Sequence, residues 1–259
     1  MIARKRFGQH FLTRPDIVAR IVRAAGVSPG DRVLEIGPGR GILTDALLAA
    51  GANLTAVEID RDLAADLRVS RPELHLVEGD AGRMDLAALV GPGARMVANL
   101  PYNVGTGIVM DSLDLGFRSI TVMLQKEVVL RMLAEPDSEH YGAISVRVAS
   151  RATGRVEFIL PPGAFNPPPK VDSAVVTLLP HASPQVGAAD VRTFDAVVRA
   201  AFAQRRKMIL NSLSSMYDRE KVAAALVSAG VAPTSRAETL DLAAFQAIAA
   251  AVAAGAKAG

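Results

Sequence analysis

Three glycines and two acids in the first third of the sequence have the spacing of a ligand site. Gly37, Gly39 and Gly41 follow a strand pattern and open a helical one, where a backbone without side chains can approach a ligand closely. Glu58 ends the next strand pattern, where a carboxylate can accept both hydroxyls of a ribose, and Asp80 ends the third, where it can accept the amino group of an adenine. Either acid alone could also be a helix cap or a solvated loop acid. Together they predict a site for a nucleoside-type ligand that comprises Gly37, Gly39, Glu58, Ile59, Asp80 and Ala81.

The charge beside the glycines separates two kinds of ligand. A pyrophosphate binds best at a helix N-terminus that is rich in free N–H groups and low in acid. Glu35 lies two residues before Gly37, where a carboxylate is unfavourable beside phosphate but favourable beside a sulfonium and an ammonium. The sequence therefore favours S-adenosylmethionine over a dinucleotide.

The tetrapeptide Asn99-Leu100-Pro101-Tyr102 follows the fourth strand pattern. The N6 nitrogen of adenine is a poor nucleophile because its lone pair is delocalised into the ring. The Asn99 side-chain oxygen and the Pro101 carbonyl could accept its two hydrogens, which would free the lone pair for attack on a sulfonium methyl group. Tyr102 could stack on the base, which must be single-stranded or flipped out. The same residues could also form a plain turn.

A proline-rich segment at 161–169 cannot form regular structure, so we expect an ordered loop there. Phe165 lies between Gly163 and three consecutive prolines, which would hold its ring rigidly. The ring could project from the loop tip or anchor the loop in the core.

The elements that must position these residues alternate between strand and helix. A helix is expected from Pro15 to Ala25, with Thr13 as its N-cap. Alternation predicts an α/β fold with a parallel, doubly wound, Rossmann-like sheet. The expected strands are 33–36, 53–57, 74–77, 95–98 and 120–124, with a closing antiparallel pair at 155–160 and 173–179, and helices reach residue 50, span 61–70 and start at Lys126.

Past Pro184 the pattern predicts helices only, at about 190–203, 205–216, 219–229 and 241–253. We expect two domains, residues 1–181 with a basic arm at 1–13, and a small all-helical domain at 182–259 that binds RNA. The clearest candidates for phosphate contacts are Arg4, Lys5, Arg6, Lys170, Arg205, Arg206 and Lys207. Any one of them could instead be an ordinary solvated charge.

Composition narrows the functional classes. The chain has no cysteine, which excludes disulfides and thiolate zinc sites, and its four histidines lack metal-ligand spacing, so we expect no metal. No secretory signal or membrane-length apolar run is evident, so we expect a soluble, cytoplasmic protein. The net charge is +3, and the basic residues gather toward both ends of the chain, which indicates a polyanionic partner.

Six motifs in order resemble the ribosomal RNA adenine N6,N6-dimethyltransferases, the KsgA/RsmA group, over nearly the whole chain. They begin at Arg4, Glu35, Asn99, Gln125, Phe165 and Phe202, and the last third of the helical domain matches more loosely. The resemblance implies an S-adenosylmethionine-dependent enzyme that dimethylates two neighbouring adenines near the 3′ end of small-subunit (16S) ribosomal RNA, during subunit biogenesis and as a monomer.

The resemblance also assigns roles to residues. Gln9, His10 and Leu12 would contact the cofactor, the last two at its methionine end, although His10 stands where many relatives have Asn. Asn99 would complete that site with Gly37, Glu58 and Asp80. Phe165 would stack on the opposite face of the adenine from Tyr102.

Three alternatives differ in substrate or in class. A related Erm-type enzyme would methylate large-subunit RNA, but Gln125-Lys126-Glu127 and Arg205-Arg206-Lys207 resemble the KsgA group better. An enzyme for DNA adenine or protein glutamine would usually carry proline at the position of Leu100. A non-catalytic assembly factor would have lost cofactor or acceptor residues, and all are present.

Overall fold

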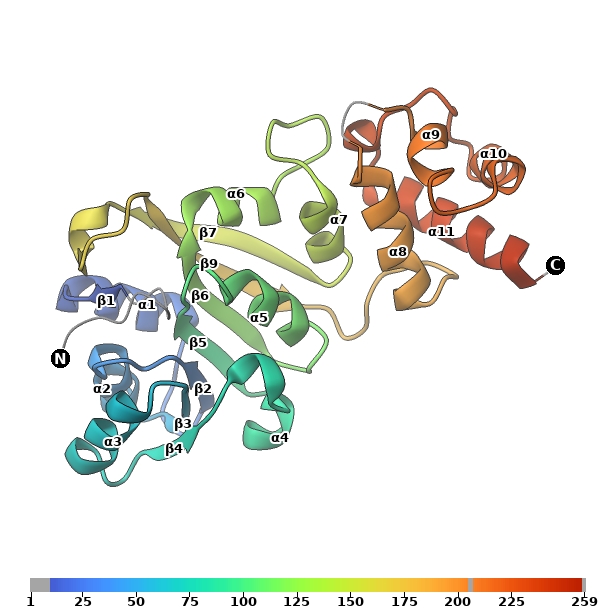
Figure 1. Cartoon of the computed structure of the whole chain (residues 1–259). Helices are drawn as coiled ribbons and strands as arrows, with labels where there is room; N and C mark the ends of the chain where they lie inside the picture. The colour runs from blue at the N-terminus through green and yellow to red at the C-terminus, as the bar shows by residue number, and fades with distance from the viewer. Residues whose placement is uncertain (1–9, 205–206, 258–259) are drawn as a thin grey trace. The chain divides into compact units, whose positions relative to one another are not determined.

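The computed structural model describes residues 10–204 and 207–257, which fold into two compact units (Figure 1). The first unit comprises the described residues up to Val129 and the segment Thr153–Ala182. The second comprises Leu130–Ala152 and the described residues from Ser183 onward. Within these described ranges, no helix is long and apolar enough to cross a membrane.

A seven-stranded sheet forms the centre of the first unit, with the strand order β4-β3-β2-β5-β6-β9-β7. Neighbouring strands from β4 to β6 are parallel, and β9 is antiparallel to β6. The predicted parallel sheet is therefore confirmed, and its order reverses between β2 and β5, where doubly wound sheets bind ligands. The strands are β2 (Arg32–Ile36), β3 (Asn53–Glu58), β4 (His75–Glu78), β5 (Arg95–Asn99), β6 (Ser119–Gln125), β7 (Ala152–Leu160) and β9 (Ser173–Pro180).

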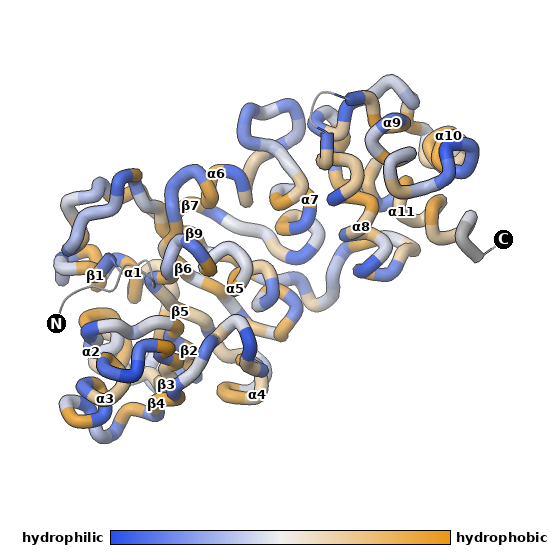
Figure 2. The backbone as a smooth tube through the Cα atoms, in the orientation of Figure 1, coloured by the Kyte–Doolittle hydropathy of each residue, from blue (hydrophilic) through white to orange (hydrophobic). Residues whose placement is uncertain are grey.

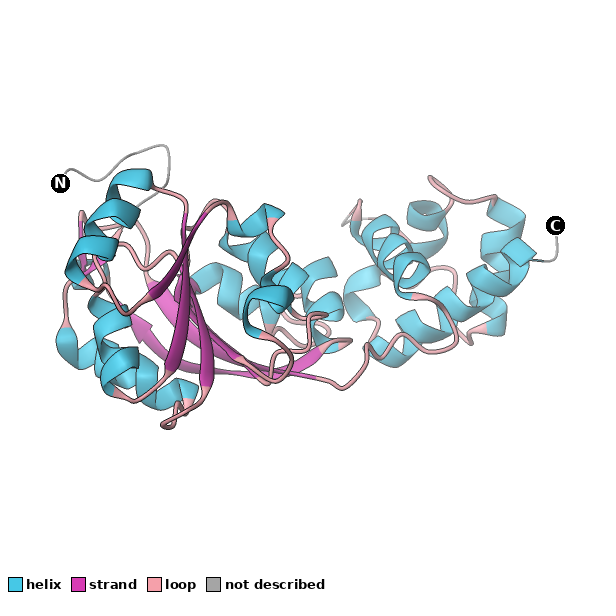
Figure 3. Ribbon diagram, turned by 90° about the horizontal axis from the view of Figure 1, so that it is seen from below, coloured by secondary structure: helices cyan, strands magenta, loops and turns pink. Residues whose placement is uncertain are grey.

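Helices flank the strands of the first unit on both sides (Figure 3). They are α1 (Pro15–Ala25), α2 (Ile42–Ala49), α3 (Arg61–Ser70), η2 (a 3-10 turn, Ala81–Arg83), α4 (Leu86–Val90) and α5 (Gly105–Ser112), and α6 (Lys126–Met132) leads out of this unit. Helices α1 and α2 pack together, and one apolar cluster joins their buried side chains to those of the sheet. That cluster fixes the strand ends from which the site residues project.

The N-terminus of α1 differs from the sequence expectation. Arg14, not Thr13, is the N-cap, and it makes no side-chain cap hydrogen bond. The Thr13 hydroxyl donates instead to the carbonyl of Ala164 at 3.2 Å, and the Thr13 N–H donates to the same carbonyl. Thr13 is therefore unavailable as a cap because it attaches the N-terminal segment to the proline-rich one.

A second, two-stranded sheet was not predicted. Strand β1 (Phe11–Leu12) pairs antiparallel with β8 (Phe165–Asn166), which follows the 3-10 turn η3 (Pro162–Ala164). The expectation that residues 161–169 hold no regular structure was therefore wrong at β8. Its two residues lie between prolines and keep their own N–H groups, so they can pair where the prolines cannot.

The second unit is helical around its own apolar core, which includes Phe194, Leu213 and Phe245. Along α8 the backbone alternates between hydrophilic and hydrophobic residues (Figure 2), as expected of a helix with one buried face. The elements are α7 (Ala143–Ala149), α8 (Val191–Phe202), α9 (Ile209–Leu213), α10 (Arg219–Ser228), η4 (Ala237–Thr239) and α11 (Leu242–Lys257). Helix α9 is shorter than predicted because Met208 and Ile209 hydrogen-bond to the segment at 235–236.

The domain boundary also differs from the sequence expectation, which placed all of 1–181 in one domain. Leu130–Ala152 belongs to the helical unit. The Tyr141 hydroxyl donates to the Leu240 carbonyl at 2.7 Å, and the buried Asp195 of α8 accepts hydrogen bonds from Arg147 and Arg151. These contacts link residues far apart in sequence, which local pattern does not reveal.

Candidate cofactor and adenine site

A cavity of about 240 Å³ opens at the carboxyl ends of β2, β3, β4 and β5. The structure brings together there every described residue predicted for the cofactor site, namely His10, Leu12, Gly37, Gly39, Glu58, Ile59, Asp80, Ala81 and Asn99. Leu100, Pro101 and Tyr102 line the same cavity. Residue Gln9 lies outside the described residues.

The glycine turn has no room for a side chain at two of its glycines, Gly39 and Gly41. Gly39 has φ of +60°, and a Cβ atom there would meet the Phe11 ring at 3.1 Å. Gly41 has φ of +84°, and a Cβ atom there would overlap the Arg71 guanidinium at 2.5 Å. The turn is therefore closed by Phe11 on one side and by Arg71 on another.

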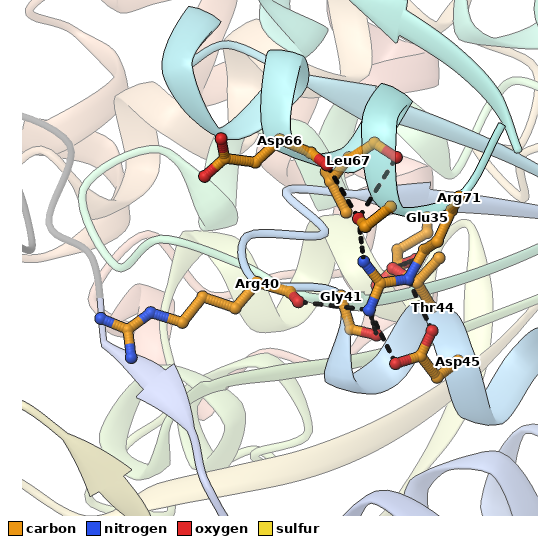
Figure 4. Close-up of polar contacts among 9 residues, drawn as sticks. Glu35, Arg40, Gly41, Thr44, Asp45, Asp66, Leu67 and Arg71 are labelled. Carbon is orange, nitrogen blue, oxygen red and sulfur yellow. Dashed lines mark hydrogen bonds and ion pairs between the residues drawn. The ribbon is translucent and has the colours of Figure 1, made fainter. Parts of the chain in front are cut away.

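Arg71, at the end of α3, connects the glycine turn to α2 (Figure 4). Its guanidinium forms a two-point pair with Asp45, at 2.6 and 2.7 Å, and approaches the carbonyls of Arg40 and Gly41 at 3.5 Å. It holds the turn from outside the cavity. Sequence reasoning missed Arg71, since nothing in the local pattern links residue 71 to residues 40–45.

Glu35 lines the cavity and is almost completely buried, at 1% exposed. The hydroxyl of Thr44 donates to its carboxyl group at 2.7 Å, and Glu35 makes no ion pair with any described residue. Burial raises the pKa of Glu35 to about 8. A buried acid without a cationic partner is a suitable neighbour for a positively charged ligand.

Glu58 and Asp80 each combine a local structural role with a place in the cavity. The Glu58 carboxylate accepts from the N–H groups of Gly39 and Asp60, and burial raises its pKa. Asp80 caps the 3-10 turn η2 by accepting from the Gly82 N–H at 3.0 Å. These structural roles leave room for the predicted ligand roles, because each carboxylate has about four lone-pair sites.

The turn after β5 changes the expected pair of acceptors. The Pro101 carbonyl already accepts from the N–H groups of Val104 and Gly105, at 3.3 and 2.8 Å, so both of its lone pairs are engaged. No donor within the described residues reaches the Leu100 carbonyl or the Asn99 Oδ1. The expectation for Pro101 is corrected accordingly, and the available acceptors are the Asn99 side chain and the Leu100 main chain.

Tyr102 is held at both ends of its side chain. Its hydroxyl shares a hydrogen bond of 2.6 Å with Ser173 of β9, and burial raises its pKa. Its ring lies 5.5 Å from the His10 ring, centroid to centroid, at 30°. Tyr102 therefore presents a fixed, partly exposed ring beside Asn99, as a stacking surface requires.

Phe165 lies in the apolar core, which is the second of the two positions that the sequence allowed for its ring. It is 5% exposed and packs in the apolar cluster with Leu12, Leu160 and Ala164. It is not among the described residues that line the cavity. In this structure its ring anchors β8.

The basic candidates are described only in part. Lys170 and Lys207 are exposed. Arg4, Lys5, Arg6, Arg205 and Arg206 lie outside the described residues. Their contacts to phosphate therefore stay a prediction.

Four features define a Rossmann-like methyltransferase of the S-adenosylmethionine-dependent class: the sheet order, the glycine turn, the acids at the carboxyl ends of β3 and β4, and the tetrapeptide that begins at the last residue of β5. A family model described as Ribosomal RNA adenine dimethylase matches residues 2–254. The chain is 47% identical over 253 residues to the Ribosomal RNA small subunit methyltransferase A of Thermosynechococcus vestitus, with 93% of each chain covered. The chain belongs to the ribosomal RNA adenine dimethylase family.

Two solved structures resemble both units. A dimethyladenosine transferase from Plasmodium falciparum matches with a TM-score of 0.77 and 26% identity, over 92% of this chain and 96% of that one. The 23S rRNA methyltransferase ErmE matches with a TM-score of 0.69 and 27% identity, over 94% and 99%. The likeness covers the Rossmann-like unit and the helical one.

Proposed function

We propose that this protein dimethylates the N6 nitrogens of two adjacent adenines near the 3′ end of small-subunit (16S) ribosomal RNA, with S-adenosylmethionine as methyl donor. The observation that carries the proposal is the pair of free acceptors, Asn99 Oδ1 and the Leu100 carbonyl, in a cavity that also contains Glu35 and Glu58. Curated relatives named for the small subunit share 44–47% identity with this chain, against 27% for ErmE, which favours the small subunit over the large one.

The residues of the cavity fit S-adenosylmethionine. Glu35 is a buried acid that makes no ion pair within residues 10–204 and 207–257, which suits a ligand that carries a sulfonium and an ammonium. Glu58 retains lone pairs for ribose hydroxyls, and Asp80 retains them for an adenine amino group. When bound, S-adenosylmethionine supplies an electrophilic methyl group.

The chain's own contribution to the reaction is positioning. Asn99 Oδ1 and the Leu100 carbonyl accept the two N6 hydrogens of the target adenine, which draws the nitrogen toward a tetrahedral geometry and frees its lone pair. Tyr102 stacks on one face of the base. No side chain has to remove a proton before transfer. The same proposal includes action as a monomer in the cytoplasm. It also includes RNA binding by Lys170, Lys207 and the other predicted basic residues, Arg4, Lys5, Arg6, Arg205 and Arg206.

The deciding experiment is incubation with labelled methyl donor and isolated small and large subunits that lack the modification, followed by mapping of the methylated bases. We expect two adjacent dimethyladenines in the small-subunit RNA alone. Label in the large subunit would establish the Erm-type alternative. Label in neither, from a folded protein that binds the donor, would refute the proposal.

A matched variant tests the acceptor. Asn99→Ala removes Oδ1, and we expect transfer to fall by about 100-fold or more while RNA affinity stays unchanged. Asn103→Ala, an exposed residue of the same cavity, is the control and should retain activity. Robust transfer by Asn99→Ala would show that Asn99 is not the acceptor.

A further inference from the structure

His10 contacts two parts of the site that are far apart in the sequence, residues 99–102 and residue 167. Its main-chain carbonyl accepts from the Asn99 side-chain amide at 3.2 Å. Its ring nitrogen Nδ1 lies 2.8 Å from the carbonyl of Pro167, and its ring is 5.5 Å from the Tyr102 ring. The residue therefore joins the N-terminal segment to the turn after β5 and to the proline-rich segment.

The contact with Asn99 fixes which way the amide points. A main-chain carbonyl can only accept, so the NH₂ group of Asn99 must face His10, and its Oδ1 must point elsewhere. Oδ1 is the atom that has to accept a hydrogen from the target base. The opposite rotamer would present a donor to another donor and would not hold the base.

The contact with Pro167 fixes the His10 ring in the same way. Because the Pro167 carbonyl also only accepts, Nδ1 must carry a hydrogen. This bond extends the β1–β8 pairing by one residue, since Phe11 already pairs with Asn166. The side chain thereby holds the segment that carries the His10 carbonyl.

We propose that His10 is a positioning residue for the target base, which orients the Asn99 amide through its carbonyl and is itself anchored by its Nδ1–H on Pro167. This inference rests on the proposed adenine methylation. It differs from a role in holding the methyl donor, because it predicts an effect on turnover with bound donor rather than on affinity for the donor.

Three substitutions separate the two features of the side chain. His10→Asn places an amide N–H close to the position of Nδ1 and removes the ring. His10→Phe keeps a ring beside Tyr102 and removes the donor. His10→Ala removes both.

We expect His10→Asn to keep kcat within about threefold of the wild type, and His10→Phe and His10→Ala each to lose about 10- to 100-fold, the cost of misplaced reacting groups. The dissociation constant of the methyl donor, measured by titration calorimetry without RNA, should change less than about threefold in all three. Thermal unfolding confirms that each variant is folded.

Three results would overturn the proposal. Equal turnover of His10→Phe and the wild type would show that the donor to Pro167 is not needed. A loss in His10→Asn as large as in His10→Ala would assign the role to the ring. Weakened donor binding with unchanged kcat at saturation would make His10 a cofactor ligand. Because all three are measured against an active wild type, failure of the proposed function itself, no transfer by the wild type, is a separate outcome.

Discussion

Glu35 shows how one residue can link folding to the chemistry of the cavity. Its carboxyl group is buried beside Thr44, and its pKa is raised to about 8, whereas the glutamate of an unfolded chain has a pKa of about 4.3. Between these pH values the folded protein binds a proton that the unfolded chain releases. The contribution of Glu35 to the free energy of unfolding is therefore fully present at low pH and is lost as the pH rises to about 8.

Glu35→Gln removes this titration and keeps an acceptor for the Thr44 hydroxyl. We expect the wild type, free of methyl donor, to lose up to about 1.4 kcal/mol of stability per pH unit more than Glu35→Gln between pH 6 and 8. Urea unfolding at pH 6, 7, 8 and 9 measures the difference. Glu73→Gln, at an exposed position, should follow the wild-type curve. Parallel curves for the wild type and Glu35→Gln would contradict the expectation.

At the scale of elements, the glycine turn and α5 contain glycines in opposite circumstances. Gly39 has a left-handed backbone and the Phe11 ring against it. Gly107 lies on the exposed side of α5, with nothing within 4 Å of an added Cβ and without positive φ. The same substitution by alanine should therefore change stability in opposite directions.

Gly39→Ala should destabilise the protein by about 1–2 kcal/mol and weaken binding of the methyl donor, because the turn must change shape to fit the side chain. Gly107→Ala should be neutral or stabilise it by up to about 1 kcal/mol, since alanine is the better helix former. Urea unfolding and calorimetric titration with the donor measure both effects. A Gly39→Ala variant as stable as Gly107→Ala would show that the turn is not constrained as described.

Element by element, the sequence predicted what depends on local pattern. The five parallel strands and α3 are recovered to within one or two residues, because apolar runs and helical periodicity are local. Helices α4, α5 and α7 were missed, since they are short and their sequences also suit strands or turns. The β1–β8 pair and the free Leu100 carbonyl depend on contacts between distant segments or on the detailed course of a turn, which composition and spacing do not encode.

At the scale of the whole molecule, the chain leaves the first unit after Val129 and returns at Thr153. The segment between them, Leu130–Ala152, is held against α8 by Asp195, which pairs with Arg147 and the buried Arg151 at 3.1 Å each. Asp195→Ala would remove the carboxylate that both guanidinium groups contact. We expect it to destabilise the helical unit by about 3–5 kcal/mol, and hydrogen exchange should show faster opening in α7 and α8 together.

The control is Asp190→Ala, which removes only an exposed helix cap and should cost about 1 kcal/mol of stability. Equal losses of stability in the two variants would show that Asp195 does not hold the segment Leu130–Ala152 in place.

The charge of the chain bears on its affinity for RNA rather than on its fold. A net charge of +3 is small, so binding to a polyanion must depend on where the basic residues gather. Arg205 and Arg206 precede the exposed Lys207, and replacing both with alanine should weaken binding to small-subunit RNA at 50 mM salt. The slope of log affinity against log salt should also become shallower by about two, since each phosphate contact releases about one counterion. The control is the double substitution of Arg14 and Arg236 by alanine. Each of these arginines already pairs with an acid, Asp16 or Glu238, so both should contribute little to RNA binding. If the double substitution at 14 and 236 changes the slope as much as that at 205 and 206, binding follows total charge, and no RNA surface is formed by the residues around 205–207.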